Sequence, residues 1–298
     1  MQHLLSQNQD TLVKKASYLR IAARELAEGM KTGNFRSLYK GQGIEFAGVR
    51  DYIRGDDVRS IDWNVTARMG RPYVKVFEEE RELQIFLIVD SSLSMQLGSK
   101  PRTKYESAAE TAALIAIAAE MNNCPIGAIF FDGKLNFSLT PQLGQERTML
   151  ILTHLDKIPD EIQKGSILGN ALTGAGKMIN KRSLIFILSD FRSSDWEKPL
   201  ISLAHKNDVV AMRIQNSFDE QLPEVGAADF IDIESSTTIT LETNKEKFKE
   251  DWKGFNKSSL YQWQELCVKH GVTPVVMQTS DDPLFVLSTV FTKSGNSI

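Results

Sequence analysis

The stretch LQIFLIVDSSLS, at residues 83–94, decides the fold. It is a nearly continuous apolar run that ends in Asp90 and continues into a group of serines. A second run of the same character, SLIFILSDF at residues 183–191, carries Asp190 at its end. Such runs are typical of strands buried on both faces, as in a parallel sheet covered by helices. The two stretches therefore predict neighbouring strands of a parallel α/β sheet.

Apolar strands alternate with helical patterns around and after these two runs. Helices are predicted at 104–121, 145–158, 167–180, 195–205, 245–269 and 282–292, and further strands at 125–132, 134–140, 208–215 and 271–279. The pair Asp132-Gly133 predicts a tight turn between two of these strands. The alternation predicts one α/β domain over residues 83–298, with a doubly wound, mostly parallel sheet, helices on both faces and a β-hairpin insertion near 216–243.

Residues 1–82 have a different character and are predicted to form a separate N-terminal part. Residues 9–31 carry apolar side chains at helical spacing, so a helix is expected there. Residues 34–82 are rich in glycine, arginine, aspartate and aromatics, and no helical period runs through them. Short extended pieces between glycines fit this segment best, so we expect a small β-rich appendage.

The composition narrows the class of protein. The chain has 298 residues, of which 42% are hydrophobic and 24% charged, and its net charge is -3. No basic excess indicates a nucleic-acid or anionic-membrane partner. The two cysteines show no metal-ligand spacing, and no secretory signal or bilayer-spanning run is present. We therefore expect a cytoplasmic protein with no membrane span.

Polar residues gather where ligands of open α/β sheets bind, at the carboxyl ends of strands near a switch in strand order. The candidates are Asp90, Ser92, Ser94, Ser166 and Asp190. Two carboxylates with hydroxyls form a hard-oxygen set that suits Mg²⁺, or alternatively Mn²⁺ or Ca²⁺, and no histidine or cysteine points to zinc. The structural alternative is a strand end followed by a capping loop, where Asp and Ser are also favoured.

The segment before the first run carries a dense set of charged and aromatic residues. They are Arg50, Tyr52, Asp56, Asp57, Arg59, Asp62, Trp63 and Arg68. An internal network of ion pairs and hydrogen bonds is one interpretation, because arginine pairs with carboxylates in a bidentate way. The other is a partner surface around Trp63, since Trp and Arg are enriched at binding hot spots. The composition favours the network.

Two families are similar to these patterns. An Asp-x-Ser-x-Ser after a buried strand, a later hydroxyl residue and a strand-ending Asp resemble the metal-ion-dependent adhesion site of von Willebrand factor A domains. Asp90, Ser92, Ser94 and Asp190 match this pattern, and Ser166 stands where the family usually has threonine. The resemblance implies a von Willebrand factor A-like fold.

The pattern GxGxEFxxxRxYxxGDDxRxIDWxxTAR, which starts at Gly41 and ends at Arg68, resembles the prokaryotic family called domain of unknown function fifty-eight. That resemblance implies this segment directly before an A-like domain, and a MoxR-type AAA+ ATPase as partner.

Three functions remain open from the sequence. The favoured one is a non-enzymatic interaction module whose Mg²⁺ accepts an acidic residue of a partner, working with a MoxR-type AAA+ ATPase in protein maturation or complex remodelling. A Mg²⁺-dependent, phosphatase-like hydrolase would use Asp90 as nucleophile, although position 92 is serine and not the second carboxylate expected there. The third is a structural domain whose metal site is vestigial.

Overall fold

The computed structural model describes residues 22–24, 26–27, 45–78, 83–96, 102–156, 167–220, 227–231, 238–242 and 245–293. By its internal contacts the chain divides into two compact units. The smaller is Tyr39–Leu83, and the larger comprises Met1–Leu38 and Gln84–Ile298.

A six-stranded sheet forms the centre of the larger unit, with the strand order β10-β7-β6-β3-β4-β5. All neighbours are parallel except β5, which is antiparallel to β4. The strands are β3 (Ile85–Asp90), β4 (Ile126–Phe131), β5 (Leu135–Gln142), β6 (Leu184–Ser189), β7 (Asp208–Gln215) and β10 (Thr273–Gln278). Every residue of β3, β4 and β6 is buried, as their apolar runs predict. The mixed α/β class with a mostly parallel sheet is confirmed.

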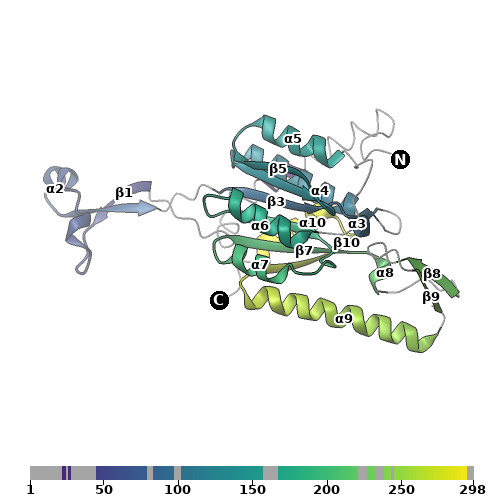
Figure 1. Cartoon of the computed structure of the whole chain (residues 1–298). Helices are drawn as coiled ribbons and strands as arrows, with labels where there is room; N and C mark the ends of the chain where they lie inside the picture. Colours follow the sequence, from purple (N-terminus) through teal and green to yellow (C-terminus); the bar gives the residue numbers. More distant parts are fainter. Residues whose placement is uncertain are drawn as a thin grey trace. The chain divides into compact units, whose positions relative to one another are not determined.

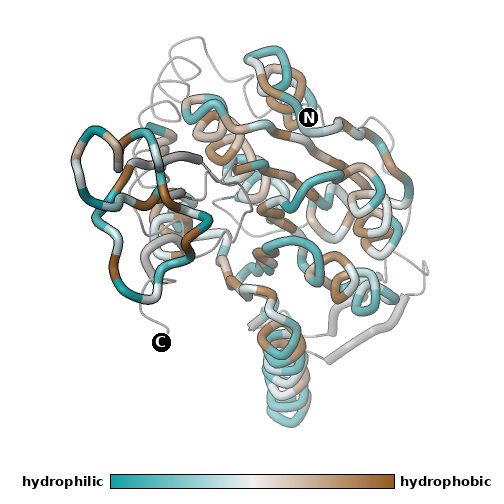
Figure 2. The backbone as a smooth tube through the Cα atoms, turned by 90° about the vertical axis from the view of Figure 1, so that its left-hand side faces the viewer, coloured by the Kyte–Doolittle hydropathy of each residue, from teal (hydrophilic) through white to brown (hydrophobic). Residues whose placement is uncertain are grey.

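Helices cover both faces of this sheet (Figure 1). One face carries α4 (Lys104–Met121), α5 (Gln145–Asp156) and α10 (Pro283–Lys293). The other carries α6 (Leu168–Met178), α7 (Glu197–Ala204) and α9 (Glu246–Lys269), whose apolar side chains share one core with the strands. Figure 2 shows α9 as a largely hydrophilic helix, in line with its buried residues being Trp263 and Cys267.

The chain order places a switch point between β3 and β6. From β3 the chain passes to β4 and β5 on one side of it, and it then returns to β6, β7 and β10 on the other. The carboxyl ends of β3 and β6 therefore lie side by side where the winding reverses, which is where open α/β sheets bind ligands. Two short helices follow strand ends on this edge, α3 (Leu93–Gln96) after β3 and α8 (Ser217–Glu220) after β7.

Three further features complete the larger unit. An antiparallel pair, β8 (Ala227–Ile231) and β9 (Thr238–Glu242), falls within the predicted insertion. Residues 22–24 and 26–27 are helical, while most of the helix predicted over 9–31 lies outside the described residues. Both cysteines are free and buried. Within the described ranges, no helix is both long and apolar enough to cross a bilayer.

The smaller unit is an antiparallel pair, β1 (Glu45–Asp51) and β2 (Tyr73–Glu78), joined by the 3₁₀ turn η2 (Val58–Ser60) and the helix α2 (Trp63–Met69). The expectation that this segment holds only extended pieces is wrong at α2. Asp62 accepts hydrogen bonds from the first backbone N–H groups of α2, and Gly70 ends it in the left-handed conformation. Seven residues are too few to show a helical period, so these caps were the available signal.

Candidate functional site

Asp90 lies at the end of β3 and is almost fully buried, with 1% of its surface exposed. Its two carboxylate oxygens are held separately. The Ser92 backbone N–H donates to Oδ1 at 2.9 Å, and the Ser189 hydroxyl donates to Oδ2 at 2.7 Å. Burial, and then the negative charge of Asp190, raise the pKa of Asp90 to about 6. The carboxylates of Asp90 and Asp190, at the ends of adjacent strands, therefore influence one another.

The serines after Asp90 divide into two roles. Ser92 Oγ and Ser94 Oγ lie 3.1 Å apart and form a hydroxyl pair beside the Asp90 turn. Ser91 instead ties β3 to β4, because its hydroxyl donates to the Phe131 carbonyl at 2.8 Å. Of the three serines, the candidate ligands Ser92 and Ser94 therefore lie together, whereas Ser91 bonds elsewhere.

Asp190 follows β6 and is also buried. Its Oδ1 accepts the Arg192 backbone N–H at 3.2 Å, and its Oδ2 lies 3.3 Å from the Lys104 ammonium. Lys104 is the first residue of α4, and only 3% of its side chain is exposed. A buried ammonium is strongly destabilising unless it is paired. Asp190 is therefore both a candidate metal ligand and a partner of a protein cation.

Lys104 belongs to an ion-pair network that the sequence did not reveal. Its ammonium lies 3.0 Å from Oδ2 of Asp219, on α8, and the Arg192 guanidinium lies 2.5 Å from Oδ1 of the same carboxylate. The network joins residues that are 86 and 115 positions apart from Lys104. Arg213, on β7, is a further buried cation beside it, and burial lowers the pKa of its guanidinium.

Ser166, the remaining candidate ligand, lies outside the described residues. The next residue, Ile167, is described, and its backbone N–H donates to the Asp132 carbonyl at 3.1 Å. Asp132 follows β4, the neighbour of β3 in the sheet. The chain at position 167 is therefore anchored at the carboxyl edge of β4.

The donor set is chemically suited to a hard divalent cation. Oxygens on adjacent positions of a Mg²⁺ octahedron are about 2.9 Å apart, given Mg–O bonds of about 2.0–2.1 Å. The Ser92 and Ser94 hydroxyls, at 3.1 Å, fit such a pair. Within the part of the chain that the structure describes, no three His, Cys, Asp or Glu side chains gather as a metal site. A metal here would depend on the serine hydroxyls together with Asp90 and Asp190.

Several charged residues of the smaller unit hold its fold. The Arg50 guanidinium bonds both Asp56 oxygens, at 2.7 and 2.8 Å, and this contact lowers the pKa of Asp56 to about 2. Asp57 caps η2, and Asp62 caps α2. The Tyr52 backbone N–H donates to the Pro72 carbonyl at 2.9 Å. These contacts agree with the predicted internal network.

Other residues of that segment are turned outward. Trp63, in α2, is 67% exposed, and Val58, in η2, is 59% exposed. Arg59 and Arg68 are exposed as well. On α2, Trp63 and Ala67 are one helical turn apart, while Val65 and Thr66 occupy the half-buried face. The structure therefore divides the predicted set into residues that bond within the segment and an exposed face around Trp63.

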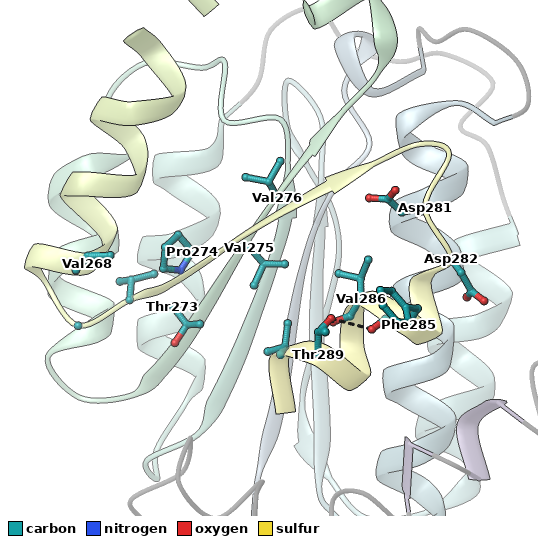
Figure 3. A pocket seen from close by; sticks show the side chains of 13 residues that line it. Val268, Thr273, Pro274, Val275, Val276, Asp281, Asp282, Phe285, Val286 and Thr289 are labelled. Atoms are coloured by element: carbon teal, nitrogen blue, oxygen red, sulfur yellow. Dashed lines mark hydrogen bonds between the residues drawn. The ribbon is translucent and has the colours of Figure 1, made fainter. Parts of the chain in front are cut away.

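A pocket of about 750 Å³ lies along β10, the edge strand of the sheet, and α10 (Figure 3). Figure 3 shows Val275 and Val276 on opposite sides of the strand. Pro274 has no backbone N–H to offer, and the Gln278 N–H already donates to the Asp281 carboxylate at 2.8 Å. These two features disfavour addition of another strand at this edge. The lining is mostly apolar, so the candidate chemistry remains at the ends of β3 and β6.

Comparisons with known proteins give a family and distant likenesses. The family described as "Protein of unknown function DUF58" matches residues 48–260. Uncharacterized proteins of Mycobacterium tuberculosis and Mycobacterium bovis are 28% identical over 221 residues, covering 73% of this chain and 69% of each relative.

Among solved structures, an aerotolerance-related membrane protein from Bacteroides fragilis has a TM-score of 0.48 at 16% identity, covering 72% of this chain and 100% of that one. The pilus adhesin SpaC from Lactobacillus rhamnosus GG has a TM-score of 0.41 at 12% identity, covering 74% of this chain and 31% of that one. Both scores lie below 0.5, so neither likeness identifies the fold.

Proposed function

Since the chain belongs to the DUF58 family, whose description assigns no activity, we propose a function from its site: a non-enzymatic docking module that binds an acidic side chain of a partner protein through a divalent metal ion. The observation that carries the proposal is the grouping of Asp90, Ser92, Ser94 and Asp190 at the switch point of the sheet. The Asp-x-Ser-x-Ser pattern resembles the adhesion site of von Willebrand factor A domains. On that resemblance we propose a von Willebrand factor A-like arrangement with Mg²⁺, Mn²⁺ or Ca²⁺ as the ion.

The roles of the residues follow from their contacts. The Ser92 and Ser94 hydroxyls, being a close pair of neutral oxygens, would bind the ion directly. Asp90 and Asp190 would supply the negative charge, and Ser166 would add a further hydroxyl. When bound, the ion offers a positive charge at which a partner's carboxylate completes the ligand set. Ser189 and the Ser92 N–H hold Asp90 in one orientation for this purpose.

The same contacts argue against catalysis by Asp90. A nucleophilic carboxylate needs an oxygen that can approach a substrate, whereas Asp90 is buried and both its oxygens accept hydrogen bonds. Lys104 is placed near Asp190, where a phosphatase could use a cation. Its side chain is, however, only 3% exposed, and its ammonium lies between two carboxylates. Phosphoester turnover that disappears in Asp90→Asn would nevertheless restore the hydrolase alternative.

We propose a MoxR-type AAA+ ATPase as the partner, because the motif from Gly41 to Arg68 resembles a family whose members accompany such ATPases. The exposed face around Trp63 would form a second contact with it, since a large aromatic beside arginines has the composition of a binding hot spot. Protein maturation or complex remodelling is the process that this partnership implies.

Metal titration and partner binding together test the proposal. We expect Mn²⁺ affinity, measured by isothermal titration calorimetry, to fall at least about tenfold in Asp90→Asn, since one charged ligand is lost. Asp132→Asn is the matched control, because Asp132 is a buried aspartate at the end of the adjacent strand whose side chain accepts the Lys134 N–H at 2.9 Å. Its Mn²⁺ affinity should match wild type.

Binding of a MoxR-type ATPase should require Mg²⁺ in wild type and in Asp132→Asn, and should be lost in Asp90→Asn. Equal binding in Mg²⁺ and in EDTA would exclude a metal-bridged contact. Absence of Mn²⁺ binding by the folded wild-type protein would support the vestigial alternative.

A further inference from the structure

Lys104 holds its two carboxylates unequally. Its ammonium lies 3.0 Å from Asp219 and 3.3 Å from Asp190. Asp219 is held by other groups as well, since Arg192 contacts it at 2.5 Å and the Asn216 backbone N–H donates to it at 2.9 Å. For Asp190 the only other hydrogen bond among the described contacts comes from the Arg192 backbone N–H, at 3.2 Å. Lys104 could therefore leave Asp190 and remain paired with Asp219.

The formal charges around the proposed metal site are already balanced by the protein. Asp90, Asp190 and Asp219 carry three negative charges, and Lys104, Arg192 and Arg213 carry three positive ones. All six residues except Arg192 are buried. Interactions between charges are stronger in such surroundings than in water. A divalent ion entering this set would bring two uncompensated positive charges close to an ammonium.

We infer that Lys104 is a resident cation that competes with the divalent ion for Asp190 and so keeps metal affinity low until an acidic partner arrives. The inference rests on the proposed function and specifies how that site is regulated. A partner's carboxylate would offset part of the excess positive charge, so metal and partner would each strengthen binding of the other. Lys104 acts here as a positioning residue, with Asp219 retaining its ammonium when Asp190 turns to the metal.

Opposite shifts in Mn²⁺ affinity test this role, measured on the full chain by calorimetry without any partner. Lys104→Met should bind Mn²⁺ at least about tenfold more tightly than wild type, because a like charge beside the ion is removed. Asp219→Asn should bind more weakly, because the ammonium is then left to Asp190. A residue that only supported the fold would not raise affinity when removed.

The double variant Lys104→Met/Asp219→Asn separates competition from net charge. It removes one charge of each sign, so the net charge of the protein is unchanged. It also leaves no unpaired carboxylate at position 219, so it can be used if Lys104→Met alone fails to fold. We expect it to bind Mn²⁺ more tightly than wild type. Lys177→Met, which removes an exposed lysine on α6, is the matched control for overall charge and should leave Mn²⁺ affinity unchanged.

The outcomes distinguish this inference from the proposed function. If wild type binds Mn²⁺ and both Lys104 variants bind it equally well or more weakly, the competition is refuted while the metal site stands. An increase in Lys177→Met as large as that in Lys104→Met would also refute it, since a long-range charge effect would then explain both. If no folded variant binds Mn²⁺, both the inference and the proposed function fail.

Discussion

Replacing Asp90 by asparagine should stabilise the protein at neutral pH when no divalent ion is present. Burial and the charge of Asp190 raise the pKa of Asp90 from 3.8 to about 6. A carboxyl whose folded-state pKa is raised favours the folded protein while it is protonated. This contribution is fully present below the unfolded-state pKa and is lost as pH rises through about 6. Above that pH, the ionised carboxylate destabilises the fold.

The size of the effect follows from the pKa difference. A folded-state pKa of about 6 in place of 3.8 makes the ionised form of Asp90 about 3 kcal/mol less favourable to folding at pH 7.5 than the protonated form. In Asp90→Asn, the amide oxygen can still accept from the Ser92 N–H. The amide NH₂ group, however, replaces the oxygen that accepted from the Ser189 hydroxyl. That lost hydrogen bond removes about 1 kcal/mol at any pH. The net gain in the free energy of unfolding for Asp90→Asn should therefore be about 2 kcal/mol at pH 7.5.

Urea denaturation in EDTA at pH 4.5 and pH 7.5 measures this gain as the difference between variant and wild type. Groups that do not interact with Asp90 titrate alike in both proteins and cancel from the difference. Asp219→Asn is the contrasting control, because Lys104 and Arg192 pair with that carboxylate and its removal should destabilise the fold at pH 7.5. If Asp90→Asn is less stable than wild type by the same amount at both pH values, ionised Asp90 is not held at a stability cost and the argument fails.

Three further changes test the fold and the smaller unit. Gly127→Ala would place a Cβ 2.7 Å from the Leu139 carbonyl oxygen, so its free energy of unfolding, measured by urea denaturation, should fall by about 1–3 kcal/mol. In the control Gly174→Ala, the nearest contact of the new Cβ would be 3.6 Å, so this variant should be as stable as wild type or more stable. Asp62→Ala should weaken α2 by about 1 kcal/mol, seen as faster hydrogen exchange of the amides it caps, and unchanged exchange there would contradict its capping role. Trp63→Ala should leave the free energy of unfolding within about 0.5 kcal/mol of wild type but reduce binding of the proposed ATPase partner, and intact binding would exclude Trp63 from the proposed contact.

The central sheet could be predicted from the sequence because strands buried on both faces consist almost entirely of apolar residues. A strand between two neighbours and under two helix layers is apolar at nearly every position, and the runs at 83–90 and 183–191 show this up to their carboxyl ends. Asp90 and Asp190 end adjacent strands, so their proximity follows once the strand order is doubly wound. The Asp132-Gly133 turn also follows from local chemistry, since β4 and β5 are antiparallel neighbours.

The charge network could not be predicted in the same way. Lys104 lies in the first turn of α4, a position where lysine is normally exposed, and nothing local indicates that its ammonium reaches Asp190 and Asp219. Pairs this far apart in the chain are decided by tertiary packing. The role of Trp63 was also ambiguous, because composition alone did not separate residues of an exposed face from residues that bond within the segment, such as Arg50 and Asp56.

The contrast between Asp90 and Asp132 bears on whether this edge is structural or functional. Both are buried aspartates after adjacent parallel strands, and each accepts a backbone N–H from two residues further on. Asp90 differs because its second oxygen is fixed by Ser189 of β6 while its charge faces that of Asp190. If the turn had only a structural role, asparagine at position 90 would make the protein more stable than aspartate does.

An ionised carboxylate is advantageous there if a cation joins the site, because the same charge that destabilises the metal-free protein then attracts the ion. It follows that Mg²⁺ should reverse the order of stability at pH 7.5, raising the free energy of unfolding of wild type but not that of Asp90→Asn. If Mg²⁺ stabilises neither protein, the raised pKa of Asp90 is only a consequence of packing.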